Sequence, residues 1–287
     1  MLLRSLGTSL LIGVLAAGGA LTSSCSSSSD SSSGSPSATD AGGSSGQRPT
    51  TTLFAASIKT VTIEIDYAAG AEPYVGVVKD FGDPWNLFNA NALAIFDGKK
   101  KVTFPRTIAK MEKLADVPAK NFSNKDILEV AAAHRTEMQY SDAVAFYFVF
   151  LNGYWIDDAG VEQKEVLSVS IGTTGVVGLF KPAISTPVVN PTPPLQFVEQ
   201  LALVHALGHT VGFVENGVPV GEANRAHIDT ENPHHCTNQQ CAMSFRVESA
   251  TGAAAYAKTL IRNPEAVLIG QECLTDARLL ETRQLNQ

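Results

Sequence analysis

The chain has 287 residues, of which 44% are hydrophobic and 17% are charged, and its formal net charge is -7 at pH 7. This apolar content can build a sizeable core, so it excludes a chain that is disordered throughout. Four cysteines are too few for a disulfide scaffold of this size. The negative charge, without a dense run of Lys or Arg, argues against nucleic acid as a partner. Only the N-terminal segment carries a long apolar run, which excludes a membrane protein with several spans.

The first 25 residues have the pattern of a secretory signal. Arg4 gives the positive start, Leu10 to Leu21 form the apolar run, and small residues lead to Cys25. This end resembles a bacterial lipobox, after which the cysteine is lipidated, although Thr22 stands where such motifs usually have Leu. We therefore expect a lipid anchor on Cys25. The alternative is an ordinary secretory signal in which Cys25 has no role.

A Ser-rich segment, residues 26–55, follows the signal and has almost no apolar residues up to about Thr52. Such a segment cannot bury enough surface to offset its loss of conformational entropy, so we predict a disordered tether. With a folded region at residues 56–287, this layout indicates an extracytoplasmic bacterial lipoprotein that meets the membrane only through Cys25, or a secreted protein. Thiols can oxidise in such a compartment.

The folded region is predicted to be α/β. Strands are expected where apolar residues alternate or run continuously, and helices where they recur at helical spacing. In chain order we expect a strand at Ile58–Tyr67, a helix at Lys125–Glu137 capped by Ser123 or Asn124, strands at Ala143–Leu151 and Val166–Ile171, a Pro-rich loop at Thr186–Pro194, and a helix at Leu195–Val214. This order predicts a mixed, twisted sheet with a backing helix and an active-site helix in residues 56–214. Residues 215–287 are expected to form a smaller, irregular C-terminal subdomain.

Histidines are concentrated in one part of the chain, with five of the six lying between residues 205 and 235. His205 and His209 are four residues apart on the last predicted helix, so both imidazoles project from one face, one turn apart. This spacing lets two ring nitrogens reach one metal ion at ~2.0–2.1 Å. The pattern therefore predicts a metal site on this helix.

The segment from His205 to Gly212 reads H-A-L-G-H-T-V-G, close to the zincin pattern H-E-x-x-H with the metzincin glycine. After an insertion, the chain continues His235-Cys236, four residues, Cys241, one residue and Met243. Together these segments resemble archaemetzincins, a family of metzincin zinc peptidases. The resemblance implies a zincin-like fold, Zn²⁺ as cofactor, and Met243 as the apolar base beneath the metal. Gly212 would let the helix end and the chain turn back.

Ala206 is the first departure from the family pattern. In zincins this position carries the Glu that acts as general base, and Ala has no group that accepts a proton. The ligands can still hold the ion, so we expect this chain to be nearly inert. Two explanations stay open: a Glu-to-Ala substitution made to trap an inactive enzyme, and a natural pseudoenzyme. Glu215 and Glu199 are the candidates for a replacement base.

The third metal ligand is the second departure, because Glu215 stands where the metzincin pattern has its third His. His235 is the first choice, since it precedes Cys236 as the resemblance requires. His227, His234 and Glu215 remain alternatives, and His227 could instead support a ligand or belong to a second metal site. Acidic residues in the insertion have no regular calcium-loop spacing, so we interpret them as part of a solvated loop.

The cysteines are the third departure. The resemblance implies a second, structural zinc, which a Cys-x4-Cys segment holds together with a later Cys-x-x-Cys segment. Here the later pair would be Gly270 and Cys273, so one ligand is missing. Cys236, Cys241 and Cys273 therefore form either a second metal site or a Cys236–Cys241 disulfide, and we favour the disulfide.

Two functions follow. The resemblance implies a zinc-dependent endopeptidase that acts on peptide or protein substrates as a monomer. The strand at Val166–Ile171 would then align an extended substrate by β-augmentation. The alternative is a non-catalytic, zinc-binding surface lipoprotein that binds a peptide or a protein partner.

Overall fold

The computed structural model describes residues 50–186, 194–260, 263 and 266–285. They belong to one compact unit, Gly42–Gln287. The predicted signal, Cys25 and most of the predicted Pro-rich loop lie outside the described residues. Leu53 and Phe54 are buried in the core, so the folded region already includes the last residues assigned to the tether. Within the described residues, no helix combines the length and apolar character needed to cross a membrane.

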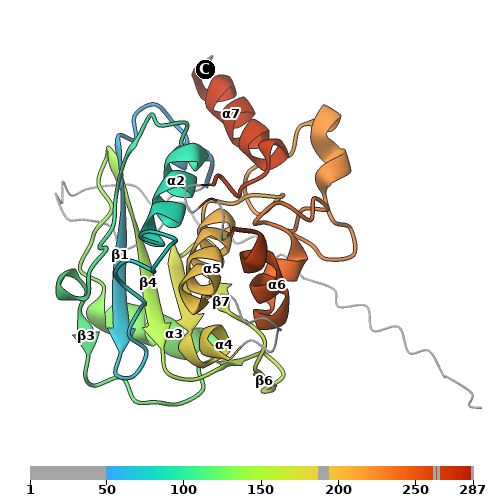
Figure 1. Cartoon of the computed structure of the whole chain (residues 1–287). Coiled ribbons are helices and arrows are strands. Elements are labelled where there is room, and N and C mark those ends of the chain that lie inside the picture. The colour runs from blue at the N-terminus through green and yellow to red at the C-terminus, as the bar shows by residue number, and fades with distance from the viewer. Residues whose placement is uncertain (1–49, 187–193, 261–262, 264–265, 286–287) are drawn as a thin grey trace, which may run out of the picture. The chain divides into compact units, whose positions relative to one another are not determined.

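A mainly parallel sheet forms the centre of this unit (Figure 1). Its strand order is β2-β1-β4-β8-β7, with β3 also paired to β1, and β7 is antiparallel to β8. A separate antiparallel pair joins β5 to β6. The strands are β1 (Thr60–Ala68), β2 (Lys101–Thr103), β3 (Lys113–Leu114), β4 (Ala143–Leu151), β5 (Trp155–Ile156), β6 (Glu162–Gln163), β7 (Ser168–Ser170) and β8 (Val176–Phe180). The predicted mixed α/β class is confirmed.

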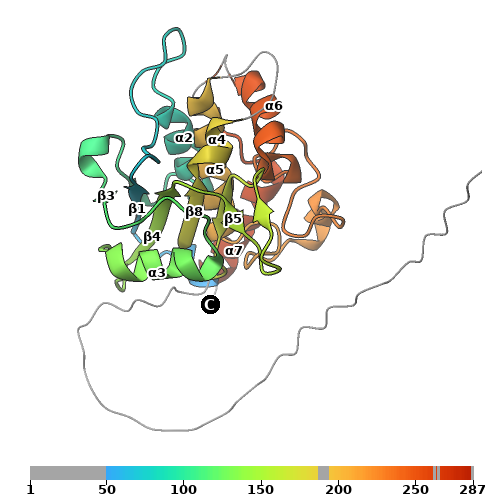
Figure 2. The ribbon, with the colours of Figure 1, turned by 90° about the horizontal axis from the view of Figure 1, so that it is seen from below.

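Helices cover both faces of the sheet. Figure 2 shows α2, α4 and α5 on one side of the row of strands and α3 on the other. The α-helices are α1 (Thr50–Leu53), α2 (Trp85–Ile95), α3 (Asn124–His134), α4 (Lys181–Ser185), α5 (Leu195–Thr210), α6 (Ala250–Leu260) and α7 (Gln271–Leu285). Three short 3-10 helices are η1 (Ile108–Lys110), η2 (Glu222–His227) and η3 (Phe245–Glu248).

The elements predicted from apolar runs are present. β4 has the bounds that were predicted and lies between β1 and β8, which explains its nearly continuous apolar sequence. Ser123 caps α3, with its side chain and that of Asp126 forming a reciprocal capping box. The α5 helix ends at Thr210, before the predicted Val214, because Gly212 adopts a φ of 92° that stops the helical path.

Several elements were not predicted. α2 contains three Asn residues that lower its helix propensity, yet burial of Trp85, Leu87 and Phe88 stabilises it. β8 has only five residues and a central Gly178, whose missing side chain leaves room for Ile127 of α3; a Cβ there would lie 2.8 Å from Ile127 Cδ1. The C-terminal part, expected to be irregular, contains the regular helices α6 and α7.

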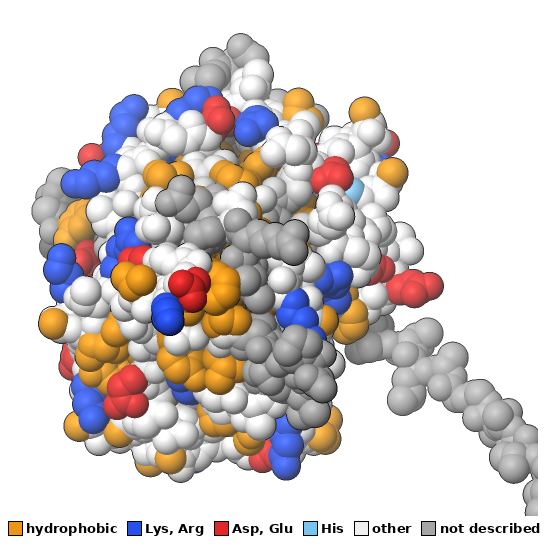
Figure 3. Space-filling view, viewed as in Figure 1, with side chains coloured by type: hydrophobic (Ala, Val, Ile, Leu, Met, Phe, Trp, Pro, Cys, Tyr) orange, Lys and Arg blue, Asp and Glu red, His pale blue; other side chains and the backbone are white. Residues whose placement is uncertain are grey.

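Charged side chains are mixed over the face seen in Figure 3. Lys and Arg side chains are interspersed there with Asp and Glu side chains, and neither sign gathers into a single patch.

Candidate metal centres

Helix α5 presents the first two histidines. The helix is buried along most of its length, and His205 is 1% exposed. As the spacing predicted, both rings lie on one face, with centroids 4.5 Å apart and planes at 84°. Their Nε2 atoms are 3.0 Å apart. Two imidazole nitrogens thus point to one place beside the helix.

Met243 packs against α5 directly between these two histidines. A Cβ on Gly208 would lie 2.1 Å from Met243 Sδ, so only glycine leaves room for this sulfur. Met243 is fully buried, and its carbonyl accepts a hydrogen bond from the Cys236 amide. The turn that carries Met243 is thereby fixed to the segment that carries His235.

His235 reaches the site from a tight turn in the insertion. Asp229 organises this turn: its carboxylate accepts hydrogen bonds from the amides of Glu231 and Asn232, and its own amide donates to the His235 carbonyl. His234 adopts a φ of 66°, which reverses the chain just before His235. The His235 ring then lies over the His205 ring, with centroids 5.5 Å apart, and 5.0 Å from the His209 ring. We refer to His205, His209 and His235 as the three-histidine centre.

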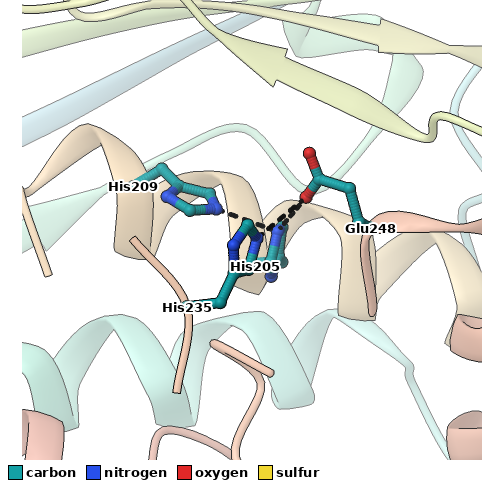
Figure 4. A group of neighbouring side chains, drawn as sticks. All are labelled: His205, His209, His235 and Glu248. Atoms are coloured by element: carbon teal, nitrogen blue, oxygen red, sulfur yellow. Dashed lines mark hydrogen bonds and ion pairs between the residues drawn. The ribbon is translucent and has the colours of Figure 1, made fainter. Parts of the chain in front are cut away.

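Glu248 is a fourth member of this group, and the sequence analysis missed it. Figure 4 shows its carboxylate and the three imidazoles pointing toward one another. Glu248 Oε2 lies 2.6 Å from His205 Nε2 and 3.4 Å from His235 Nε2. The ligand atoms of all four residues lie within 4.8 Å of one another, so the group could hold a metal ion. Glu248 is at the end of η3, five residues after Met243, and no motif used above includes it.

Backbone carbonyls fix the orientation of two rings. His205 Nδ1 lies 2.7 Å from the Ala242 carbonyl oxygen, and His235 Nδ1 lies 2.9 Å from that of Pro233. A carbonyl only accepts hydrogen bonds, so each Nδ1 carries a proton and each Nε2 faces the centre. Such outer partners are typical of metal-binding histidines.

Electrostatics inside the group favour a neutral His209 and an ionised Glu248. Burial, together with the neighbouring His205, holds the pKa of His209 well below its usual value. Burial also acts to raise the pKa of Glu248, but its close contacts with His205 and His235 outweigh it and hold that pKa far below the usual value. These are the protonation states that a metal ion requires of its ligands.

The other candidate residues lie outside the three-histidine centre. Val214 and Glu215 both have positive φ, and this turn directs Glu215 to Arg225, with a distance of 3.1 Å between Oε1 and Nη1. His234 is exposed. Glu199 is fully buried, accepts a hydrogen bond from the Tyr74 amide and pairs with Lys181. Neither proposed replacement base, Glu199 or Glu215, belongs to the group around His205.

A second group consists of His227, Cys236 and Cys273, whose ligand atoms also lie within 4.8 Å of one another. Cys241 adjoins it, with 3.8 Å between its sulfur and that of Cys273. His227 directs Nδ1 to Cys273 Sγ at 3.9 Å, while its Nε2 lies 2.9 Å from Asp276 Oδ2. We refer to His227, Cys236, Cys241 and Cys273 as the thiol centre. His227 thus supplies a fourth side chain in place of the cysteine that the family pattern has at the position of Gly270.

The structure contradicts the favoured disulfide. Cys236, Cys241 and Cys273 are buried free thiols. Hydrogen bonds from the Cys236 and Cys273 thiols, supported by the Gly270 and Met243 amides, hold the pKa of Cys241 well below its usual value. The inserted segment places His227 beside the thiols. The cysteines therefore form a polar cluster with His227 and not a disulfide-closed loop.

The edge of the sheet runs past Ala206. Ser170 of β7 donates a hydrogen bond from Oγ to the Ala206 carbonyl, at 3.0 Å. The Leu167 carbonyl accepts a hydrogen bond from Phe180 and the Ile171 amide donates to Val176, so the antiparallel pattern turns the backbone groups of Ser168 and Ser170 toward the outer edge. The predicted edge strand is therefore present beside the centre, although β8 and α4 separate it from α5 in sequence.

No protein-family model, curated protein or solved structure matches this chain. The likeness to archaemetzincins therefore depends on the residues of the motif alone. What the described residues establish is two groups of side chains with the chemistry and spacing to hold metal ions.

Proposed function

We propose that this chain is a zinc protein of the metallopeptidase type, whose three-histidine centre binds Zn²⁺ and which, with Ala206, hydrolyses peptide bonds very slowly. The observation that carries the proposal is the convergence of three Nε2 atoms, two of them on rings oriented by the Ala242 and Pro233 carbonyls. Imidazole nitrogen is a preferred zinc ligand, and two histidines four apart on a helix are the usual basis of such a site.

Zinc in such a site lowers the pKa of a bound water toward ~7 and polarises a substrate carbonyl. The contribution of the chain is to hold the ligands, to exclude bulk water through buried neighbours such as Met243, and to present a strand edge at Ser168 and Ser170. An extended peptide could pair with this edge. What the chain does not supply at position 206 is a proton acceptor.

A non-catalytic role is the second candidate. It is favoured by the same Ala206, because the ligands and the strand edge are kept while the group that performs proton transfer is missing. In this case the centre and β7 would bind a peptide or a protein partner without cleaving it.

The decisive experiment compares the starting chain with Ala206→Glu on casein, with and without a chelator. We expect both forms to bind zinc and the Glu form alone to show chelator-sensitive cleavage, faster by about 10²–10⁴-fold, as general-base catalysis typically contributes. A Glu form that folds and binds zinc but does not cleave would favour the binding protein. Equal cleavage by both forms would show that position 206 is not the base. A starting chain that binds no zinc would overturn the proposal.

The thiol centre is proposed to hold a second Zn²⁺ with a structural role. A closed set of three cysteines and one histidine is a common structural zinc arrangement, and Asp276 orients His227 as an outer carboxylate does. Metal analysis should therefore give about two zinc ions per chain, falling to about one in Cys273→Ser.

Location at a membrane remains a separate proposal. A lipid on Cys25 would anchor the chain outside the cytoplasm. Labelling with a radioactive fatty acid in a bacterial host should mark the chain but not Cys25→Ser, and fractionation should release that variant from the membrane.

A further inference from the structure

The fold brings the carboxylate of Glu248 to the three-histidine centre, although the sequence motif of the histidines does not include this residue. We propose that Glu248 is the fourth protein ligand of this centre, so that the chain itself fills the coordination position that an open catalytic zinc site leaves to water. The inference rests on the proposed zinc binding and deepens it: with Glu248 bound, a water reaches the ion only as a fifth ligand or by displacing the carboxylate, so the closed position adds to the slow hydrolysis proposed for the chain with Ala206.

The four ligand atoms lie close enough together for four-fold coordination, although two of the contacts would have to lengthen around an ion. Ligands about 2.0–2.1 Å from one ion at tetrahedral angles lie ~3.3–3.4 Å from one another. His205 and His209 are 3.0 Å apart at Nε2, and Glu248 Oε2 lies 2.6 and 3.4 Å from His205 and His235. All four ligand atoms fall within 4.8 Å of one another. Glu248 Oε2 thus occupies a corner of the same small polyhedron as the nitrogens.

The directions of the lone pairs also support a metal ion between these four residues. Because Nδ1 of His205 and of His235 donate to carbonyls, a neutral ring offers Glu248 only the lone pair of Nε2. A carboxylate oxygen also carries only lone pairs. Such atoms repel one another at these distances unless a proton or a cation lies between them, and one divalent ion satisfies all four at once.

Backbone contacts with the segment before β7 hold the main chain around Glu248 in place. Leu167 donates a hydrogen bond to the Glu248 carbonyl, at 3.3 Å, and Ala250 donates to that of Glu165, at 2.7 Å. Val166 and Ser249 form a β-bridge between these contacts. The residue is therefore fixed by strand-like pairing on its main chain, with its side chain turned to the histidines. A pre-positioned side chain loses little entropy when it binds a metal.

A Glu248 that binds the metal can be distinguished by experiment from a Glu248 that only forms hydrogen bonds with the histidines. If Glu248 is a ligand, its removal opens the fourth position to an outside molecule. Acetohydroxamate, which binds zinc through two oxygens, serves as the probe. We expect zinc-loaded Glu248→Ala to bind acetohydroxamate at least tenfold more tightly than the starting chain in calorimetry. Glu215→Ala, the same truncation at a carboxylate outside the centre, should leave this affinity unchanged.

A crystal structure of the zinc-loaded starting chain supplies a measurement that needs no variant. We expect a Glu248 oxygen within about 2.0–2.2 Å of the ion. A water in that position with the carboxylate more than 3 Å away would overturn the proposal, as would acetohydroxamate binding that is no tighter in Glu248→Ala. A starting chain without zinc would instead overturn the proposed function, so the two failures are distinguishable.

Discussion

His205 and Ala242 join the three-histidine centre to the thiol centre: Nδ1 of the histidine lies 2.7 Å from the carbonyl oxygen of the alanine, which directly follows Cys241. The connection is repeated on the other side, where His235 directly precedes Cys236. Each end of the Cys236–Cys241 loop thus touches a ligand of the three-histidine centre. The position of the three-histidine centre therefore depends on the loop that carries two residues of the thiol centre.

This relationship predicts that damage to the thiol centre weakens zinc binding elsewhere. Cys273→Ser should lower the zinc affinity of the three-histidine centre by about 10–100-fold, the usual effect of losing an outer partner. Competition with a chelator at increasing concentration would measure it. Thr275→Ala, at an exposed position of the same helix, is the control. An unchanged affinity in Cys273→Ser would show that the centres are independent.

Gly208→Ala should destabilise the chain although Ala favours helix over Gly by ~1 kcal/mol. The new Cβ would lie 2.1 Å from Met243 Sδ, and such overpacking typically costs about 1–3 kcal/mol. Denaturant unfolding would measure the difference. In a Met243→Ala background the same Gly208→Ala change should cost nothing, because the sulfur is gone. An equal cost in both backgrounds would contradict the contact.

Asp66 makes stability depend on pH in a region far from the metal ligands. Burial raises its pKa to about 6, although the Glu112 amide donates to its carboxylate. A raised pKa means that the folded chain holds the proton more tightly than the unfolded chain. Stability from this group is present below pH ~4 and is lost as the pH rises through about 6.

Asp66→Asn should remove this loss, since an amide does not ionise. Relative to the starting chain, the variant should gain about 2–3 kcal/mol in free energy of unfolding between pH 4 and pH 7, from 1.36 kcal/mol per pKa unit. Urea unfolding at several pH values would measure this difference. Asp158→Asn, at an exposed position, should give a difference that does not change with pH. A flat profile for Asp66→Asn would refute the assignment.

Lys181 and Glu199 form a buried ion pair, with Nζ 2.5 Å from Oε2, that secures the first half of α5. Lys181→Met should cost about 3–5 kcal/mol because it leaves a buried carboxylate without its charged partner. Adding Glu199→Gln should recover much of this cost, since the amide oxygen can still accept from Tyr74. The exposed pair of Lys125 and Glu129 provides the control: Lys125→Met should change stability by less than ~1 kcal/mol.

Local patterns explain which parts could be predicted. The spacing of His205 and His209 and the apolar run of β4 are local signals, and the structure contains both features. His235 was chosen through its neighbour Cys236, and it lies at the three-histidine centre. The helices α6 and α7 escaped prediction, because glycine and threonine weaken the first and the second has a strongly polar sequence.

The position of Glu248, which was not predicted, and that of His227, which was predicted only as an alternative ligand, depend on contacts between distant segments. Glu248 reaches the histidines because its main chain pairs with Leu167, which lies 81 positions earlier. His227 reaches Cys273 across 46 positions. No periodicity in the sequence encodes such approaches. A search for any carboxylate near the Met243 turn would have included Glu248, but it would not have distinguished it from Glu272 or the exposed acidic residues.

If β7 binds an extended peptide as proposed, the pairing of Glu165–Leu167 with Glu248–Ala250 limits how long that peptide strand can be. An extended peptide beside β7 finds outward backbone groups at Ser168 and Ser170, but the next stretch of the edge is already occupied by the chain itself. Such a peptide gains few main-chain hydrogen bonds and meets a physical stop beside Glu248. Selectivity would therefore depend on peptide length and on where a peptide ends, and a chain segment in the middle of a long strand would be a poor ligand.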